Sequence, residues 1–405
     1  MFLRSFRRNR LYKHSIVRLI VIVVALCLTW DAFTLVFYSR IPHRVSPTTD
    51  HVNHGRILIA SMHWNNEPIL RSHWNDAVLD LVKHFGPTNV FVAVLESGSW
   101  DNSKGALREL ESHLASLDVA RSIVLEDTSH VDEVSRTPLT NETGWILTSR
   151  GRKELRRITY LANIRNRVME EMHRHSNSTG TRFDKVLWLN DVVFNTEDIL
   201  TLLSTNDGHY AAACSLDFSK PPVYYDTFAL RDLSGSKTVS SEWPYYFSGA
   251  SRSALVSGDA VPVRSCWNGM VAMDAEPFYA TPPLSFRGVP DSLAEHHLEG
   301  SECCLIHADN PLSQKMGVYV NPNVRVGYNG AAYEAVNAFL TWPSPISRVT
   351  GIWKARLATF PAMLRYASER LTVSKRLSQW GGEEPGTFCL VNEMQILVEN
   401  GWKHL

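Results

Sequence analysis

One pair of polar residues lies where a buried strand is expected to end. Residues 185–194 read KVLWLNDVVF, an apolar run that reaches Asn190 and Asp191 and leads into NTED, a typical helix start. Ligands of open α/β sheets bind beyond the carboxyl ends of the strands, and Mg²⁺ and Mn²⁺ prefer oxygen ligands. The position of Asp191 therefore predicts a divalent cation that bridges the Asp191 carboxylate to two phosphates of a nucleotide. The alternative is that Asn190 and Asp191 only form a turn.

A second cluster combines acidic and aromatic residues. Residues 214–232, CSLDFSKPPVYYDTFALRD, contain three carboxylates, two tyrosines and an arginine in a segment bent by prolines. Aromatic faces beside carboxylates suit sugars, whose C–H faces stack on rings while their hydroxyls hydrogen-bond to acids. Asp226 and Asp232 are the candidate catalytic groups of this cluster. The alternative is a solvated loop that contains an ordinary ion pair between an aspartate and the arginine.

Two later motifs add further candidates. Residues 265–270, SCWNGM, place an indole beside an amide, and Trp267 and Asn268 are predicted to contact sugar. Residues 300–309, GSECCLIHAD, place Glu302, His307 and Asp309 around a short apolar run. Glu302 is a candidate acid, and His307 is a candidate metal ligand with Asp309 beside it. The alternative for His307 is a structural histidine.

Short apolar runs alternate with longer amphipathic ones from residue 56 to about residue 220. The strand candidates are RILIASM, NVFVAVLES, ARSIVLED, KVLWLND and HYAAACSLD, and the clearest helix is expected over residues 150–175. This rhythm predicts an α/β fold with a mixed, mostly parallel sheet and helices on both faces. Binding loops are expected over residues 221–330. Two short helices are expected over residues 352–364 and 388–398.

The beginning of the chain predicts a membrane anchor. The 405 residues include 41 basic and 41 acidic side chains, but residues 1–18 hold six basic groups and no acid. The apolar run over residues 16–38 is long enough to span a bilayer, and its basic flank predicts a cytosolic amino terminus. The alternative is a cleaved secretory signal. Because the basic excess belongs to a membrane flank, it predicts no nucleic-acid partner.

Glycosylation motifs and cysteines fit a lumenal location for the remaining residues. Sequons begin at Asn141 and Asn177, and five of the six cysteines follow the apolar run. Five cysteines permit at most two internal disulfides, and no spacing typical of zinc is present. The expected organisation is a cytosolic tail (1–15), a transmembrane anchor (16–38), a stem (39–54), a lumenal domain (55–340) and a C-terminal extension (341–405).

Taken in order, these motifs resemble the fungal capsule-associated α-1,3-mannosyltransferases, a family first recognised in cryptococcal capsule synthesis. The matching stretches are LWLNDVVFNTEDILTLL, YAAACSLDF, YYDTFALRDLSG, CWNGM, FRG, GSECCLIHAD and VNPNVRV, within about residues 56–330. The resemblance implies a Rossmann-type GT-A fold and a single-pass type II enzyme of the Golgi membrane with a lumenal catalytic domain. It also implies GDP-mannose as donor, a mannoside acceptor and a divalent cation, Mn²⁺ or Mg²⁺. The oligomeric state is left open.

The resemblance makes Asp191 the main metal ligand. Asn190-Asp191-Val192 is similar to an Asp-x-Asp motif, but Asn190 is uncharged and Val192 cannot bind a metal. Phosphate, water or a distant residue such as His307 or Asp309 must therefore complete the ligand set. Asn190 is then a candidate contact to the bound nucleotide.

The resemblance also suggests how the nucleotide is held and how transfer proceeds. Arg165 and Asn166 are similar to an Arg-Asn pair that related transferases direct toward the nucleotide, where a guanidinium binds diphosphate oxygens. Donor and product are both α-linked, so configuration is retained. Retention needs either a carboxylate nucleophile or a same-face route in which the leaving diphosphate takes the acceptor proton. Asp226, Asp232 and Glu302 are the candidate carboxylates.

These features predict a retaining α-1,3-mannosyltransferase of polysaccharide or glycan synthesis. Two alternatives stay open. A lumenal glycosidase would use paired acids without a nucleotide. A non-catalytic partner in polysaccharide assembly or export is the other alternative, because a fold and its motifs can outlive their activity.

Overall fold

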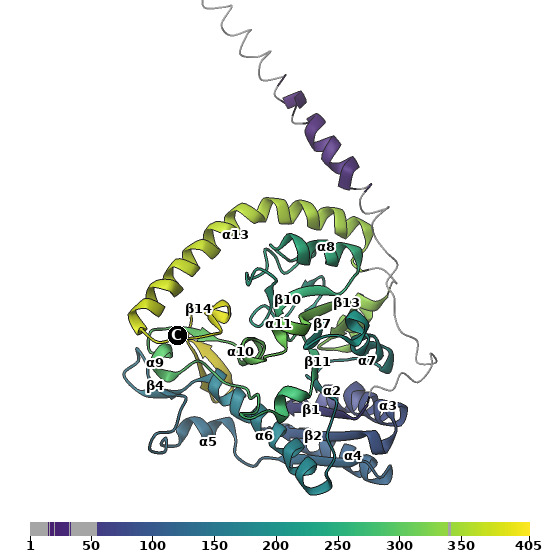
Figure 1. Ribbon diagram of the computed structural model, residues 1–405, viewed down its shortest axis with the longest axis vertical. Helices are drawn as coiled ribbons and strands as arrows, with labels where there is room; N and C mark the ends of the chain where they lie inside the picture. Colours follow the sequence, from purple (N-terminus) through teal and green to yellow (C-terminus); the bar gives the residue numbers. More distant parts are fainter. Residues whose placement is uncertain (1–14, 16, 20, 32, 34–54, 339–341) are drawn as a thin grey trace, which may run out of the picture.

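The apolar runs of the sequence form the strands of one large mixed sheet (Figure 1). The computed structural model describes residues 15, 17–19, 21–31, 33, 55–338 and 342–405. The strand order is β3-β2-β1-β6-β11-β7-β13-β10-β9, and β8 pairs with β7. The strands are β1 (Ile57–His63), β2 (Val90–Glu96), β3 (Ala120–Leu125), β6 (Lys185–Leu189), β7 (Ala212–Lys220), β8 (Val223–Tyr224), β9 (Arg231–Asp232), β10 (Val261–Ser265), β11 (Met270–Asp274) and β13 (Val318–Gly327).

Strand direction divides the sheet into two parts. The strands β3, β2, β1 and β6 run parallel, with Ile57 paired to Val90 on one side and to Lys185 on the other. Antiparallel β11 then separates β6 from β7, and β7 runs parallel to β13. The predicted α/β fold with a mixed sheet is therefore confirmed, and its uninterrupted parallel part contains the first four strand candidates.

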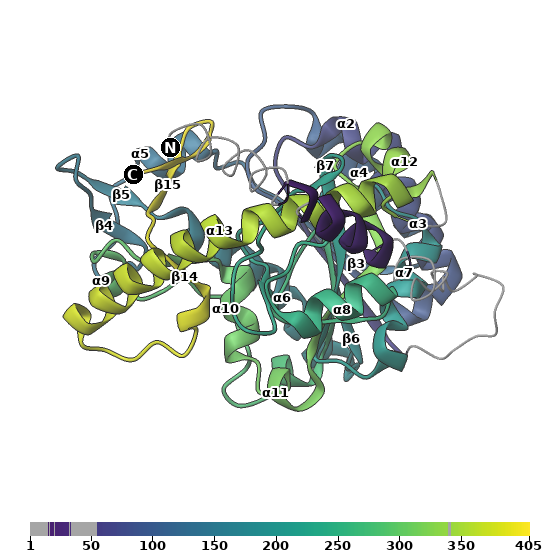
Figure 2. The same ribbon diagram turned by 90° about the horizontal axis from the view of Figure 1, so that it is seen from above.

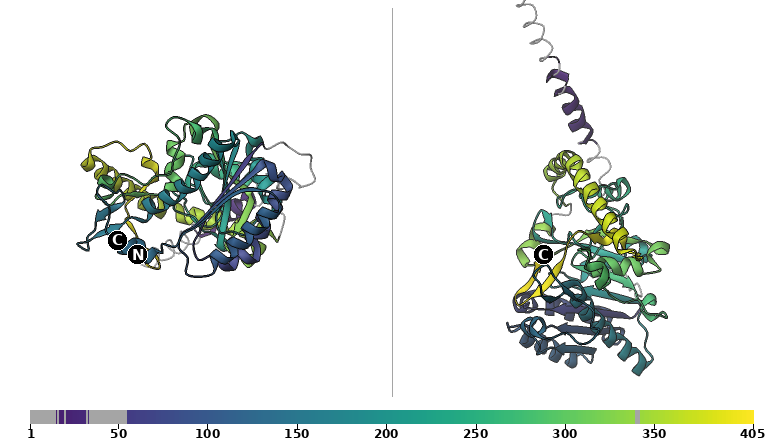
Figure 3. Two further views of the ribbon diagram at one scale, coloured as in Figure 1. Left: turned by 90° about the horizontal axis from the view of Figure 1, so that it is seen from below. Right: turned by 90° about the vertical axis from the view of Figure 1, so that its left-hand side faces the viewer.

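Helices cover both faces of the sheet, because successive residues of a strand point to opposite sides. Leu58 and Ala60 pack on one face with residues of α6 (Arg157–Thr179). Ile57 and Ile59 pack on the other face with the helices α3, α4 and α7. These three helices are α3 (Asn75–Phe85), α4 (Ser103–Ser116) and α7 (Thr196–Leu203). The left view of Figure 3 shows helices on both sides of the strands, as predicted.

Three predictions about helices need correction. The helix expected from residue 150 begins at Arg157, because Lys153–Leu155 (β5) pairs instead with Trp145–Leu147 (β4). The helix expected over residues 388–398 is wrong, since this segment forms two strands, one paired with distant residues and one in a local hairpin. These strands are β14 (Leu390–Val391) and β15 (Gln395–Val398), which pair with β12 (Glu299–Gly300) and β16 (Gly401–His404). The helix expected over residues 352–364 is part of a 36-residue helix, α13 (Pro345–Trp380).

The C-terminal segment is joined to the preceding domain by several contacts. A disulfide links Cys304 to Cys389, and Leu390 packs in one buried cluster with Leu293 and Leu305. The helix α13 crosses one side of the molecule from α8 (Gly249–Ser257) toward β14, as Figures 1 and 2 show. The segment that we delimited as residues 341–405 therefore shares a core with residues of the preceding domain.

The predicted anchor is only partly described. Residues 21–31 are helical and expose apolar side chains such as Leu26 and Trp30. Within the described ranges, the structure has no helix long and apolar enough to cross a bilayer. Residues 16, 20, 32 and 34–38 of the predicted anchor, residues 1–14 of the tail and the whole stem lie outside the described residues.

Candidate functional site at the carboxyl edge of the sheet

Asp191 lies directly beyond the carboxyl end of β6, as the sequence predicts. The backbone N–H of Asn190 donates to the carbonyl of Gly269 (2.9 Å), which fixes the chain where it leaves the strand. Asn66, which follows the neighbouring strand β1, donates from Nδ2 to Asp191 Oδ2 (2.9 Å). Burial raises the pKa of Asp191 to about 6. A partly buried carboxylate with one amide donor is a suitable oxygen ligand for a hard cation.

Residues at the end of β1 hold Asn66 and Asn190 in place. Nε2 of His63 lies 2.9 Å from Oγ of Ser61. The His63 ring also packs edge-on against Trp74, with ring centroids 4.6 Å apart. Trp74 Nε1 donates to the carbonyl oxygen of Asn190 (3.1 Å). Burial lowers the pKa of His63 to about 4, so its imidazole is neutral at physiological pH. These contacts make the β1 and β6 ends one rigid polar edge.

A pair of carboxylates lies near Asp191, around the phenol of Tyr328. Asp217 of β7 accepts hydrogen bonds from Tyr328 Oη (3.1 Å) and from Asn268 Nδ2 (3.0 Å). The backbone N–H of Asp226 also donates to Asp217 (3.2 Å). Burial, and secondly the charge of Asp226, raise the pKa of Asp217 to about 7. The pKa of Tyr328 is raised by burial and by the charges of Asp217, Asp191 and Asp226, so all three carboxylates act on one phenol.

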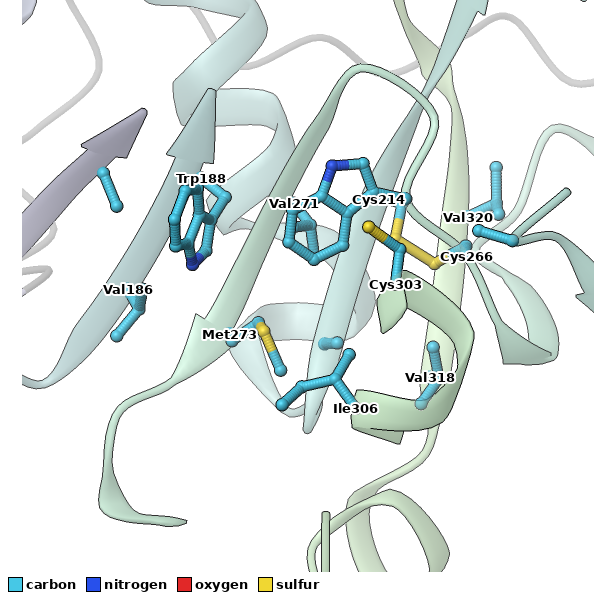
Figure 4. Close-up of a cluster of buried hydrophobic side chains, with 14 of the residues drawn as sticks. Val186, Trp188, Cys214, Cys266, Val271, Met273, Cys303, Ile306, Val318 and Val320 are labelled. Atoms are coloured by element: carbon cyan, nitrogen blue, oxygen red, sulfur yellow. A yellow bond between two sulfur atoms is a disulfide. The ribbon is translucent and has the colours of Figure 1, made fainter. Parts of the chain in front are cut away.

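The loop between β10 and β11 is shaped by a disulfide and by left-handed backbone. Cys266 is bonded to Cys214 of β7, and Figure 4 shows this disulfide among buried side chains of the sheet. Asn268 and Gly269 have φ values of 45° and 86°. A Cβ on Gly269 would lie 2.7 Å from the side chain of Val326, so glycine is required there. The loop thereby brings Asn268 into contact with Asp217. The Oδ1 atom of Asn268 is buried without a partner among the described residues.

Arg165 and Trp267 form a buried cationic and aromatic group beside Asn190. Trp267 Nε1 donates to Asn190 Oδ1 (3.0 Å), and the Arg165 guanidinium lies 4.4 Å from the centre of the Trp267 ring. Arg165 Nε also donates to Glu302 Oε1 (3.2 Å), and both side chains are buried. Glu302 therefore forms an ion pair inside the protein. Arg165 Nη1 is buried and has no hydrogen-bond partner in the part of the chain that the structure describes.

Asn166 and Asp232 make structural contacts. Asn166 exchanges two hydrogen bonds of 2.8 Å with the backbone of Phe286, which ties α6 to a distant loop. Asp232 accepts from the backbone N–H of Ser234, Ser236 and Ser248, and so holds a turn and the residue that caps α8. Neither side chain is bonded to Asp191 or to Asp217 in these contacts.

His307 and Asp309 are not brought together with Asp191. His307 Nε2 lies 2.7 Å from the carbonyl of Cys266, and burial lowers its pKa to about 4. The described residues contain one compact group of possible metal ligands, His307 with Cys214 and Cys266, but these two cysteines already form a disulfide. Asp309 forms a bidentate ion pair with Arg287. Within the described residues, Asp191 is thus the predicted metal ligand that lies at the acidic edge.

Several residues of this edge were missing from the candidates. Asp217 lies in residues 214–232, the segment noted for its three carboxylates, and it is the last residue of the strand candidate HYAAACSLD, which was the signal that singles it out. Asn66 follows the first predicted strand, in the sequence HWNN. Tyr328 ends the segment VRVGY and carries no chemical motif, so only its contact with Asp217 reveals it.

The fold and the site define an α/β protein with a polar ligand site beyond the carboxyl ends of its central strands. Residues 56–309, more than half of the chain, match the family described as cryptococcal mannosyltransferase 1. The chain belongs to this family of glycosyltransferases.

Comparisons with other proteins give two further results. The solved mannosyltransferase PcManGT from Pyrobaculum calidifontis, in complex with GDP-Man and Mn²⁺, is 13% identical, with a TM-score of 0.40 over 90% of this chain and 88% of that chain. TarS 1–349 from S. aureus is 11% identical, with a TM-score of 0.35 over 67% of this chain and 60% of that chain. No curated protein matches the chain.

Proposed function

We propose that the protein transfers mannose from GDP-mannose to a hydroxyl of a mannoside, with a new α-1,3 linkage and with retention of configuration. Membership of the mannosyltransferase family supports the reaction class. The observation that carries the proposal is the carboxylate of Asp191, which lies directly beyond the carboxyl end of β6 and is held by Asn66 from the end of β1. Nucleotides and sugars bind at this edge in open α/β sheets.

Asp191 is the residue that would hold a divalent cation, Mn²⁺ or Mg²⁺. Asp191 fits such an ion, because it offers a partly exposed carboxylate that is oriented by Asn66. A bound cation would neutralise the diphosphate and so stabilise it as a leaving group. Asn66 orients Asp191 through its hydrogen bond. Arg165 Nη1 is unpaired among the described residues but buried, so it would bind a diphosphate oxygen only after the surrounding side chains move.

Asp226 is the carboxylate best placed to act on the sugar. Its Oδ1 accepts from the backbone N–H groups of Phe228 and Ala229 (3.0 Å each), which fixes the orientation of the carboxylate. Asp226 is partly exposed, whereas Asp232 and Glu302 are buried in bonds of their own. In either retaining route, Asp226 would stabilise the positive charge that develops at the sugar carbon or hold the acceptor. Trp267 and Asn268 are 2% and 0% exposed, so they would position Asn190 and Asp217 through hydrogen bonds rather than contact the sugar.

We further propose that the chain is a single-pass Golgi membrane protein with its catalytic domain in the lumen. The basic flank of the apolar run over residues 16–38 supports this orientation. The disulfides Cys214–Cys266 and Cys304–Cys389 are compatible with the oxidising conditions of the secretory pathway.

A donor screen tests the proposed reaction. The full chain in detergent is incubated with Mn²⁺, a mannobiose acceptor and a panel of GDP and UDP sugars, and the product is examined by NMR. We expect transfer from GDP-mannose alone, with an α-configured 1,3 linkage. Transfer from UDP sugars only would overturn the donor assignment. Cleavage of mannosides without a nucleotide would support a glycosidase, and no turnover would support a non-catalytic partner.

A further inference from the structure

The helix α13 exposes an apolar stripe along its length. Ile346, Leu357, Phe360, Leu364 and Leu371 are between 57% and 78% exposed. Leu357, Leu364 and Leu371 recur every seven residues, and Ile346 precedes Leu357 by eleven. Both spacings are close to whole numbers of helical turns, so these side chains share one face. A continuous exposed apolar face marks a surface that binds a partner or a membrane.

The opposite face of α13 already packs on the protein. Its buried residues are Gly351, Ala355, Ala362 and Val373, most of them small. A Cβ on Gly351 would lie 2.2 Å from the backbone oxygen of Trp243, so the helix approaches the domain closely there. The position of Ala355 is half a turn away from that of Leu357. The apolar stripe is therefore additional to the face that stabilises the fold.

The charges of α13 are almost all positive. The helix contains seven basic residues and a single acidic one, Glu369. Lys375 follows Leu371 by four positions and so lies beside the stripe, whereas Lys354 is already paired with Glu242. Arg365 and Lys375 are exposed. An apolar stripe flanked by lysine and arginine is typical of helices that lie in the interface of an anionic bilayer.

The position of α13 agrees with this chemistry. The exposed apolar helix of residues 21–31 rises from the side of the molecule that α13 covers, in Figure 1 and in the right view of Figure 3. Asp31, which is 3% exposed, accepts two hydrogen bonds from Arg356 of α13, of 2.6 and 2.7 Å. A cavity of about 580 Å³ lies between Trp30, α8 and α13. Two exposed apolar helices are thus joined on one side of the protein.

We propose that α13 lies on the surface of a phospholipid bilayer, with its apolar stripe at the boundary of headgroups and acyl chains. The basic residues beside the stripe bind the lipid phosphates. This contact holds the catalytic domain against the membrane in one orientation, independently of which sugar nucleotide the protein uses.

Depth measurements on single nitroxide labels test the proposal. The full chain with Cys27→Ser is labelled at Leu364→Cys, or at Leu147→Cys as a control, because Leu147 is also exposed (65%) but belongs to β4 rather than to α13. The chain is reconstituted in vesicles of phosphatidylcholine with phosphatidylserine. We expect the label at position 364 to lose accessibility to a water-soluble nickel complex and to gain accessibility to oxygen. The label at position 147 should remain accessible to the nickel complex and should gain no accessibility to oxygen.

Three results would contradict the proposal. One is equal nickel accessibility at both positions in the vesicles. The second is equal protection of position 364 after Arg365→Glu with Lys375→Glu, which would exclude a role for the basic flank. The third is protection of position 364 from both nickel and oxygen in detergent, together with a dimer by light scattering, because a second copy of the chain would then cover the stripe.

Discussion

Burial of carboxylates determines much of the chemistry at the residue scale. Burial raises the pKa of Asp191 to about 6 and, with the charge of Asp226, that of Asp217 to about 7. A carboxylate whose pKa is raised by burial is stabilised when a cation or a proton neutralises its charge. The acidic edge is therefore prepared for a positively charged ligand, at a cost in stability while it is empty.

The variant Asp217→Asn tests this cost. Between about pH 4 and pH 7 the folded chain keeps a proton on Asp217 that the unfolded chain has lost, so this residue makes the wild type less stable as the pH rises. The Asp217→Asn variant does not lose stability in this way, because it has no carboxylate at this position. Its stability relative to the wild type should therefore increase across this window, by about 1.4 kcal/mol per unit of pKa shift.

Urea unfolding at several pH values measures the effect. Asp76→Asn is the matched control, because Asp76 is exposed in the first turn of α3 and its replacement removes no buried charge. A constant difference between Asp217→Asn and the wild type from pH 4 to pH 7 would refute the assignment.

The sequence predicts Asp191 because its position needs only a buried strand followed by a polar turn. The environments of Glu302 and Asp309 depend on contacts with residues far away in the chain. Glu302 pairs with Arg165, and Asp309 pairs with Arg287. A motif shows which groups are present, whereas only the fold shows which of them are already neutralised.

At the scale of elements, the loop that carries Trp267 and Asn268 depends on the disulfide Cys214–Cys266. This bond links β7 to the residue before Trp267 and closes a loop with a sequence separation of 52 residues. The sequence permits two disulfides but does not determine their pairing, because pairing depends on the order of strands in the sheet. β7 and the loop before β11 meet because β11 pairs with β7.

Replacing both cysteines by alanine should lower the free energy of unfolding by about 2–4 kcal/mol, because the unfolded chain gains freedom. The change should also weaken donor binding, since Asn268 would lose its fixed position on Asp217. Chemical denaturation and calorimetric titration with GDP measure the two effects. Cys303→Ala is the control, because Cys303 is buried but has no disulfide. If Cys303→Ala weakened GDP binding as much as the replacement of Cys214 and Cys266 does, the role of the disulfide would be contradicted.

At the scale of the whole molecule, the C-terminal segment completes the core of the domain. Tertiary pairing overrides local preference in part of this segment, since β14 pairs with a distant strand, whereas β15 forms a local hairpin with β16. Strand β14 pairs with β12, which contains Glu299. Glu299 in turn pairs with the buried Arg156 just before α6. Local periodicity in residues 341–405 could not reveal these contacts, because their partners are distant in the sequence.

Removal of residues 341–405 should therefore prevent folding of the remaining chain. Cys304 would lose its partner, and Leu305 and Leu293 would lose the apolar neighbours that cover them. We expect aggregation, or rapid cleavage in limited proteolysis, where the full chain resists. A control chain that lacks only the first 14 residues should retain its resistance. A soluble, cooperatively unfolding chain of residues 1–340 would contradict this account.

The central claim is that Asp191 holds the cation to which the donor diphosphate binds. Calorimetric titration of the full chain with GDP, with and without Mn²⁺, tests it most directly, in the wild type, in Asp191→Asn and in Asp309→Asn. We expect Mn²⁺-dependent binding in the wild type, at least about tenfold weaker binding in Asp191→Asn, and unchanged binding in Asp309→Asn, whose carboxylate is paired with Arg287. Wild-type affinity in Asp191→Asn, or loss of binding in Asp309→Asn alone, would contradict the claim.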